Sequence, residues 1–298
     1  KSLALEITNV YENGDVDLHY DYCEPLHDDR GYTCGIAGFC TGTGDAWAVV
    51  QAYHNLTGGN DAMTPFDANL DKYQNDGDKS LAPLDGFCTV WKKLGSTDAK
   101  FKQAQDEVRD SMYWDPAMAA AKTLGLKTSI AQGQLYDTSI EHGPGDDADG
   151  MLSIIKRTNA KVTADVPGKS GSTLTINGHQ IDEIAWLYLY LAERTQDLEH
   201  PLESENQGGN YWAQTTYRVK SYKYAADNNQ INWTNKVLIL DNDGNKMTVT
   251  CNNSNPNRKR KRSNTSSSGN CNKGKGGNKG KGGKGGKGGK KSHKQSMS

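Results

Sequence analysis

Glu12 and Asp28 are two carboxylates whose residue types and spacing suit the cleavage of a glycosidic bond. That reaction needs one carboxyl group that stays protonated and gives its proton to the leaving oxygen. It also needs one ionised carboxylate that activates water or attacks the sugar, and the two groups must come from separate elements across a cleft. The chain holds 36 Asp and Glu residues, so the residue types alone do not select this pair.

Hydrophobic spacing predicts the elements that carry the pair. Apolar residues recur at helical spacing near the N-terminus, at Leu3, Ile7, Val10 and Tyr11. Gly14 is a typical helix stop, so Glu12 is expected at a helix C-terminus, where the dipole favours the protonated acid. Residues 16–22 alternate between apolar and polar types, which predicts a strand that ends at Pro25. Asp28 then lies in the turn that follows.

Further elements follow from the same patterns. The sequence predicts helices over residues 98–112, 116–124, 129–142 and 182–194, and a hairpin over residues 236–250.

The residues near Asp28 have two interpretations each. Thr33 could hold a water beside Asp28, or it could be an ordinary β-branched residue of a loop or strand. Arg30 could hold Asp28 ionised, or it could be a surface arginine. Asp45 precedes the apolar run AWAVV, which favours a helix N-cap, but the same carboxylate could bind the ammonium group of an amino sugar.

Segments that suggest ion binding lack the required residues. Residues 41–44 (TGTG) lack the lysine of a phosphate loop, and residues 241–244 (DNDG) favour a hairpin turn over a calcium loop. Residues 146–149 favour a solvated acidic loop. His142, directly before Gly-Pro-Gly, favours a structural role on pattern alone. No cysteine pair has the spacing of a zinc site, so we expect no metal or cofactor.

Charge divides the chain at residue 252. Residues 252–298 contain fourteen Lys and Arg residues and no Asp or Glu, whereas residues 1–251 contain 21 basic and 36 acidic residues, a net charge of −15. The body therefore attracts polycations and the tail attracts polyanions. The tail is rich in Gly and Lys and has no apolar run to bury, which predicts a disordered basic segment after a catalytic domain over residues 1–251.

Cysteines and glycosylation sequons give weaker indications of whether the protein is secreted. Six cysteines are compatible with disulfides of unassigned pairing, and sequons for N-glycosylation begin at Asn55, Asn232, Asn252 and Asn264. No apolar stretch reaches the roughly 18–20 residues of a membrane span. These features favour a secreted glycoprotein with disulfide bonds and no membrane partner, and we expect a monomer.

Several segments together resemble the glycoside hydrolase family 46 chitosanases. They are residues 22–33 (YCEPLHDDRGYT), 38–45 (GFCTGTGD), 103–109 (QAQDEVR), 113–116 (YWDP), 136–137 (YD) and 142–145 (HGPG). The resemblance covers about residues 3–235, and its first segment is highly specific because the order of its residues is unusual. The Gly-Lys tail is not part of the family pattern.

The resemblance implies a mainly helical, α+β, lysozyme-like fold of two lobes with a small sheet and a substrate cleft. It implies an inverting endo-chitosanase with Glu12 as general acid, Asp28 as general base and Thr33 positioning the water. The resemblance also implies the other site residues: substrate contacts at Tyr22, Arg30, Asp45 and His142, and a charged network supporting the acid at Asp137 and Arg194. The family network has a second arginine, for which the sequence near Trp212 offers no obvious counterpart.

Two alternatives remain. A lysozyme-like muramidase or chitinase would use the same carboxylates, but chitosan is a polycation at mildly acid pH and suits a body of net charge −15. The second is an inactive polyanion-binding protein that acts through its tail. The presence of Glu12, Asp28 and Thr33 argues against it. For the tail two interpretations stay open. It could bind an anionic cell-wall polymer, since chitosan and the tail are both cationic, or it could be a solubilising or processed extension.

Overall fold

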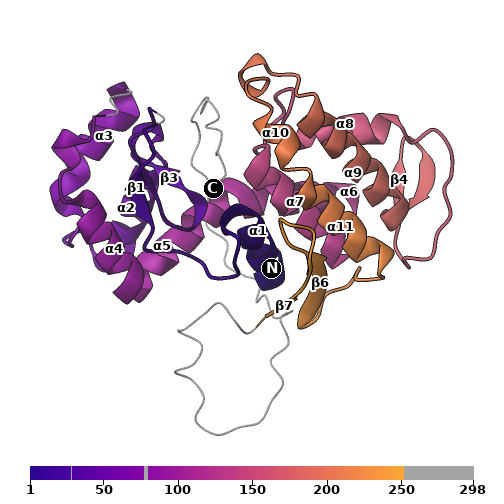
Figure 1. Ribbon diagram of the computed structural model, residues 1–298, viewed down its shortest axis with the longest axis horizontal. Helices are drawn as coiled ribbons and strands as arrows, with labels where there is room; N and C mark the ends of the chain where they lie inside the picture. Colours follow the sequence, from indigo (N-terminus) through magenta and orange to yellow (C-terminus); the bar gives the residue numbers. More distant parts are fainter. Residues whose placement is uncertain (28, 77–79, 252–298) are drawn as a thin grey trace, which may run out of the picture. The chain divides into compact units, whose positions relative to one another are not determined.

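The computed structural model describes residues 1–27, 29–76 and 80–251. These residues form two compact units, one built from residues 1–17 together with those from Pro116 onward, and one from Leu18–Asp115 (Figure 1). Asp28, Cys271, the sequons at Asn252 and Asn264, and the predicted tail over residues 252–298 lie outside the described residues. No helix among the described residues is long and apolar enough to cross a membrane.

The first unit is mainly helical. Its helices are α1 (Ser2–Asn13), α6 (Asp115–Leu124, which begins one residue earlier), α7 (Ser129–Glu141), α8 (Met151–Ala160), α9 (Glu183–Glu199), α10 (Tyr211–Gln214) and α11 (Tyr217–Asp227), with a 3-10 turn at Ser204–Asn206. Its strands form two antiparallel hairpins, β4 (Thr173–Ile176) with β5 (His179–Asp182) and β6 (Lys236–Leu240) with β7 (Lys246–Thr250).

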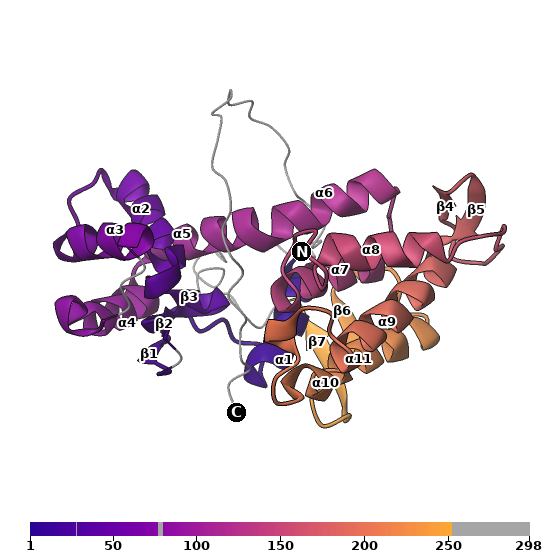
Figure 2. The same cartoon turned by 90° about the horizontal axis from the view of Figure 1, so that it is seen from above.

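Helix α7 is the core of this unit. Ten of its residues are buried, and it packs against α1, α8, α9 and α11 (Figure 2). Its N-terminus is fixed by the carboxylate of Glu183, which accepts hydrogen bonds from the backbone N–H groups of Lys127 and Thr128. The Thr128 side chain then caps the helix by accepting from Ala131 N. Polar residues on α7 are therefore held rigidly in a low-dielectric environment.

Helix α1 ends where its sequence predicts. Leu3, Ile7, Val10 and Tyr11 are buried, and Gly14 adopts a left-handed conformation (φ 78°) while its N–H donates to Val10 O. Glu12 thus lies in the last turn of α1.

The second unit combines helices with one small sheet. Its helices are α2 (Asp45–Thr57), α3 (Asp67–Asp76), α4 (Phe87–Thr97) and α5 (Ala99–Arg109), followed by a π-helical segment at Asp110–Trp114. Its strands are β1 (Cys23–Pro25), β2 (Tyr32–Cys34) and β3 (Phe39–Cys40), in the antiparallel order β1-β2-β3. Short 3-10 turns lie at Gly35–Ala37, Thr41–Thr43, Thr64–Phe66 and Ala82–Leu84.

Aromatic side chains fill the core of this unit. Trp91 packs edge-on against Phe101 at 4.8 Å between ring centroids, and Phe87 packs edge-on against Phe66 at 5.3 Å. The Cys23–Cys88 disulfide joins β1 to α4. The sheet that carries Thr33 is therefore tied covalently to the helical layer beside it.

The prediction of a mainly helical fold with small sheets is confirmed, but three local predictions are wrong. Asp149, predicted in a solvated acidic loop, is buried and accepts a hydrogen bond from Leu202 N. Residues 16–22 do not form a strand. Instead, Trp91 Nε1 and Gln105 Nε2 donate to Tyr20 O, so side chains replace a neighbouring strand as hydrogen-bond partners. Asp45 is not the N-cap of α2. The cap position is Gly44, and the Asp45 carboxylate accepts instead from the Thr43 hydroxyl at 2.9 Å.

Candidate active site

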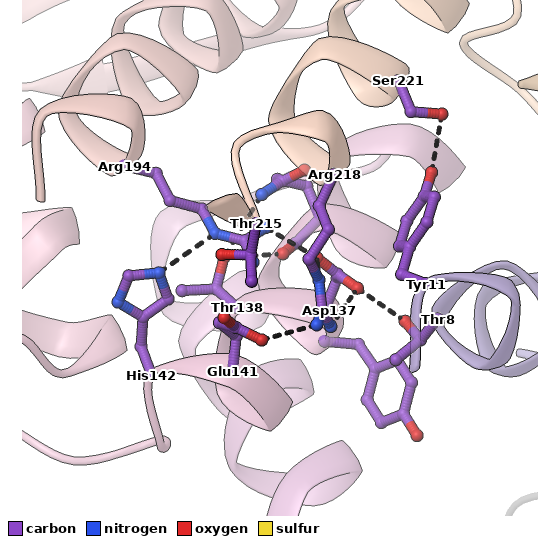
Figure 3. Close-up of polar contacts among 12 residues, drawn as sticks. Thr8, Tyr11, Asp137, Thr138, Glu141, His142, Arg194, Thr215, Arg218 and Ser221 are labelled. Carbon is purple, nitrogen blue, oxygen red and sulfur yellow. Dashed lines mark hydrogen bonds and ion pairs between the residues drawn. The ribbon is translucent and has the colours of Figure 1, made fainter. Parts of the chain in front are cut away.

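The first unit surrounds the buried carboxylate of Asp137 with positive charge. Arg194 Nη1 donates to Asp137 Oδ2 at 2.7 Å, and Arg218 donates through Nη2 to Oδ1 at 2.9 Å and through Nε to Oδ2 at 3.2 Å (Figure 3). The Thr8 hydroxyl donates to Oδ1 at 2.9 Å. Burial would raise the pKa of Asp137, but the two guanidinium groups hold that pKa below its ordinary value. Asp137 is therefore an ionised centre between two arginines.

Arg218 connects this centre to Glu12. Its Nη1 atom lies 2.5 Å from Glu12 Oε1 and 2.5 Å from Glu141 Oε2. Burial would lower the pKa of Arg218, but the charges of Asp137, Glu141 and Glu12 raise it well above the ordinary value. The guanidinium group consequently stays charged and fixes the carboxyl group at the end of α1 against α7 and α11.

Glu141 belongs to the same cluster because of its position on α7. It lies four residues after Asp137, which places both side chains on one face of the helix. The Glu141 side chain is 9% exposed. Burial raises its pKa, the charge of Arg218 opposes that effect, and the negative charge of Glu12 adds to it.

His142 lies on the other side of Arg194. Its Nε2 accepts from Arg194 Nε at 3.2 Å, so this nitrogen carries the lone pair. The proton is then on Nδ1, which lies 3.0 Å from Asp149 O and 3.3 Å from Asp197 Oδ2. His142 is thus assigned as a neutral, buried imidazole with both ring nitrogens against protein atoms. Its predicted contact with substrate stays a prediction.

Four of the predicted site residues lie in the described part of the second unit. Thr33 is buried on β2, opposite Glu24 on β1 and Cys40 on β3. Tyr22 precedes β1 and accepts from Gly35 N through its carbonyl, and the Arg30 carbonyl accepts from Gly42 N.

The side chains of Tyr22, Arg30 and Asp45 are partly buried. Asp28 itself lies outside the described residues. The residues on either side of it, His27 and Asp29, both have left-handed backbones (φ 57° and 60°). Such backbone is uncommon for residues other than glycine and clusters at functional sites.

A group of sulfur atoms lies beside Thr33. Cys34 Sγ is 3.1 Å from Cys23 Sγ, and Cys23 is bonded to Cys88. Burial, together with the nearby Cys40, raises the pKa of the Cys34 thiol, which keeps that thiol protonated. Because two of the three sulfurs form a disulfide, the group offers a single thiol to any metal ion.

Sequence reasoning missed Arg218 and Glu141. Arg218 lies six residues beyond Trp212, in a helix that the sequence analysis did not assign. Glu141 stood inside a correctly predicted helix, and its spacing of four from Asp137 was the signal that could have marked it. Each residue acquires its place only through contacts between distant segments.

Comparisons with known proteins identify the family. The model of "Glycosyl hydrolase family 46" matches residues 6–233. The chain belongs to this family. It is 36% identical over 243 residues to a chitosanase of Bacillus subtilis (strain 168), with 82% of each chain covered. As a family member, the chain is a glycoside hydrolase.

Solved structures agree with this assignment. The native chitosanase of Bacillus subtilis MY002 matches with a TM-score of 0.68 and 34% identity, over 84% of this chain and 97% of that one. A Gynuella sunshinyii family 46 chitosanase in complex with chitotetraose gives a TM-score of 0.68 and 33% identity, over 83% and 96% of the two chains. The lysozyme-like family 46 fold predicted from sequence is therefore confirmed.

Proposed function

We propose that this glycoside hydrolase is a secreted endo-chitosanase that hydrolyses β-1,4 bonds between glucosamine units. The observation that carries the proposal is family membership over residues 6–233, with relatives described as chitosanases. Two related structures are described as complexes with six glucosamine units and with chitotetraose. The net charge of −15 over residues 1–251 supports a polycationic substrate.

In the proposed mechanism Glu12 is the general acid. Its carboxyl group, 14% exposed and held by Arg218, gives its proton to the leaving glycosidic oxygen. Asp28 is the general base that takes a proton from water as the water attacks the anomeric carbon, and Thr33 positions that water. Attack from the face opposite the leaving group inverts the anomeric configuration.

Recognition of the amino sugar is assigned to partly buried side chains of the second unit. Asp45 binds the glucosamine ammonium group through a charge-assisted hydrogen bond, which an N-acetyl group cannot replace. Tyr22 and Arg30 are proposed as further contacts with the chain of sugars. Asp137 and Arg194 support the acid by holding Arg218 in place.

A reducing-end assay on chitosan, chitin and peptidoglycan, run side by side, tests the substrate. Chitosan should be cleaved fastest, and faster cleavage of peptidoglycan or chitin would favour the muramidase or chitinase alternative. Glu12→Gln and Asp28→Asn should each lower turnover by roughly 100-fold or more with the fold retained. Proton NMR of fresh products should show the α-anomer first, and the β-anomer as initial product would refute inversion.

We also propose that residues 252–298 anchor the enzyme to an anionic cell-wall polymer. Fourteen basic residues without an acidic one would release counterions from such a polymer, so binding should weaken steeply with salt. Deleting these residues should leave hydrolysis of soluble chitosan intact and abolish retention on an anionic polymer at low salt. Equal retention of the truncated and full-length proteins would exclude the anchor.

A further inference from the structure

The carboxyl groups of Glu12 and Glu141 share one hydrogen-bonding atom. Both have an oxygen 2.5 Å from Nη1 of Arg218, although they come from α1 and α7. Their side chains are 14% and 9% exposed. Two carboxylates this close in a poorly solvated site cannot both ionise easily, because like charges repel strongly in a low dielectric.

The charge of the whole cluster leads to the same conclusion. It contains two guanidinium groups, Arg194 and Arg218, and three carboxyl groups, Asp137, Glu12 and Glu141. With all three carboxyls ionised the cluster carries one net negative charge, and with a single bound proton it is neutral. Asp137 accepts hydrogen bonds from both arginines, so the proton belongs to the Glu12–Glu141 pair.

Among the described residues, the histidine and tyrosines that face the pair do not supply a compensating charge. His142 accepts from Arg194 and is neutral. Tyr217 lies on α11 beside the pair, and burial together with Glu141 and Glu12 raises its pKa to about 12, so its phenol stays protonated. Tyr11 and Tyr222 also have raised pKa values, mainly through burial, and are neutral.

We propose that Glu141 is a positioning residue that shares one proton with Glu12 and, through its negative charge, keeps Glu12 protonated as the medium becomes less acidic. This proposal rests on the assignment of Glu12 as the general acid. Ionised Glu141 opposes ionisation of Glu12, and both compete for the same Arg218 nitrogen, so the proton that cleavage needs stays on Glu12 over a wider pH range. Glu141 has no assigned contact with the sugar and acts only through Glu12 and Arg218.

The decisive measurement is kcat/KM against pH for Glu141→Gln on a chitosan oligomer. Gln removes the negative charge beside Glu12 and keeps the size of the side chain, so Glu12 should ionise more readily. The alkaline limb of the profile should move to lower pH by roughly 1 to 2 units, which lowers activity about 10- to 100-fold above that limb and much less below it. An alkaline limb at the wild-type position would overturn the proposal.

Two further variants separate charge from packing. Glu141→Asp keeps the negative charge and should return the limb toward its wild-type position, and a limb equal to that of Glu141→Gln would contradict the charge argument. Glu199→Gln removes the same charge from an exposed site at the end of α9 and should leave the limb unchanged. If the alkaline limb of this control also moved, the net charge of the protein, and not Glu141, would set the pH of that limb.

A stability measurement tests the pair without using hydrolysis. Burial and Glu12 raise the pKa of folded Glu141 above its ordinary value, so its protonated form stabilises the fold at low pH, and this contribution is lost as pH rises through the raised pKa. Urea unfolding should show a smaller loss of stability on raising the pH for Glu141→Gln than for the wild type. An equal loss would contradict proton sharing, whereas an active Glu12→Gln variant would contradict only the role of Glu12 in catalysis.

Discussion

Replacing Asp137 with Asn tests the buried network most directly. The substitution keeps the size of the side chain and removes the negative charge between Arg194 and Arg218. Asp137 accepts four hydrogen bonds, three of them from guanidinium groups. The Asn amide has one oxygen to accept them and would turn an NH₂ donor toward an arginine donor. Two buried cations would then lack their central partner.

The cost follows from burial. Removing one partner of a buried ion pair costs about 3–5 kcal/mol, because the opposite charge stays desolvated. Asp137 and Arg194 are both fully buried, so we expect a loss near the upper end, about 4–5 kcal/mol. Urea unfolding at pH 7 measures it. The matched control is Asp227→Asn, since Asp227 is also paired, with Lys223, but is 45% exposed, and its loss should stay within about 1 kcal/mol.

The pH dependence gives a second reading of the same variant. The pKa of folded Asp137 is held below the ordinary value of 3.8. Its stabilisation is therefore fully present above that ordinary value and is lost as pH falls through the lower, folded pKa. The difference in unfolding free energy between wild type and Asp137→Asn should be constant from pH 5 upward and shrink at lower pH. A difference below about 1 kcal/mol at pH 7 would refute the reasoning, because it would mean that the arginines are well solvated without Asp137.

Two other substitutions test the second unit. Asp45→Asn should weaken cleavage of fully deacetylated chitosan more than cleavage of partly acetylated chitosan, with unfolding free energy within about 0.5 kcal/mol of wild type, since Gly44 and not Asp45 caps α2; equal losses on both substrates would argue against ammonium binding. Cys88→Ser removes the Cys23–Cys88 disulfide, which closes a loop of 65 residues and stabilises the fold by about 4 kcal/mol through chain entropy. Peptide mapping of this oxidised variant should find Cys23 joined to Cys34, whose sulfur lies 3.1 Å away, and a free Cys23 would contradict this exchange.

Local patterns predicted the helix that carries Glu12, the proposed general acid, well. Residues 3–11 have helical spacing and Gly14 ends the helix with a left-handed backbone, so every signal needed to place Glu12 lies within a few residues of it. The hairpin over residues 236–250 was equally local, because strands β6 and β7 flank a turn in which Asp241 accepts from Asn245 N. The contacts that define such elements join residues close together in sequence, so the pattern of residue types predicts them directly.

The segment over residues 16–22 shows why alternation alone misleads. Its period of two is that of a strand, but a strand needs a neighbouring strand to pair with. Here the side chains of Trp91 and Gln105, from helices α4 and α5, donate hydrogen bonds to the carbonyl oxygen of Tyr20. Those partners lie 71 and 85 residues away in sequence, so no local pattern could have predicted these hydrogen bonds.

The charged cluster is the least local feature of the candidate site. Arg218 meets Glu12 across 206 residues of sequence and Glu141 across 77. A family resemblance can carry over Asp137 and Arg194 by matching motifs, but it carries no information about a residue whose motif does not match. The role of Glu141 becomes visible only once folding has brought two arginines and three carboxyl groups together. Their charges can then be summed, and proton sharing depends on their distances and burial. The proposed role of Glu141, which is to widen the pH range over which Glu12 stays protonated, therefore follows from the packing of α1, α7 and α11. No single segment of the chain indicates it.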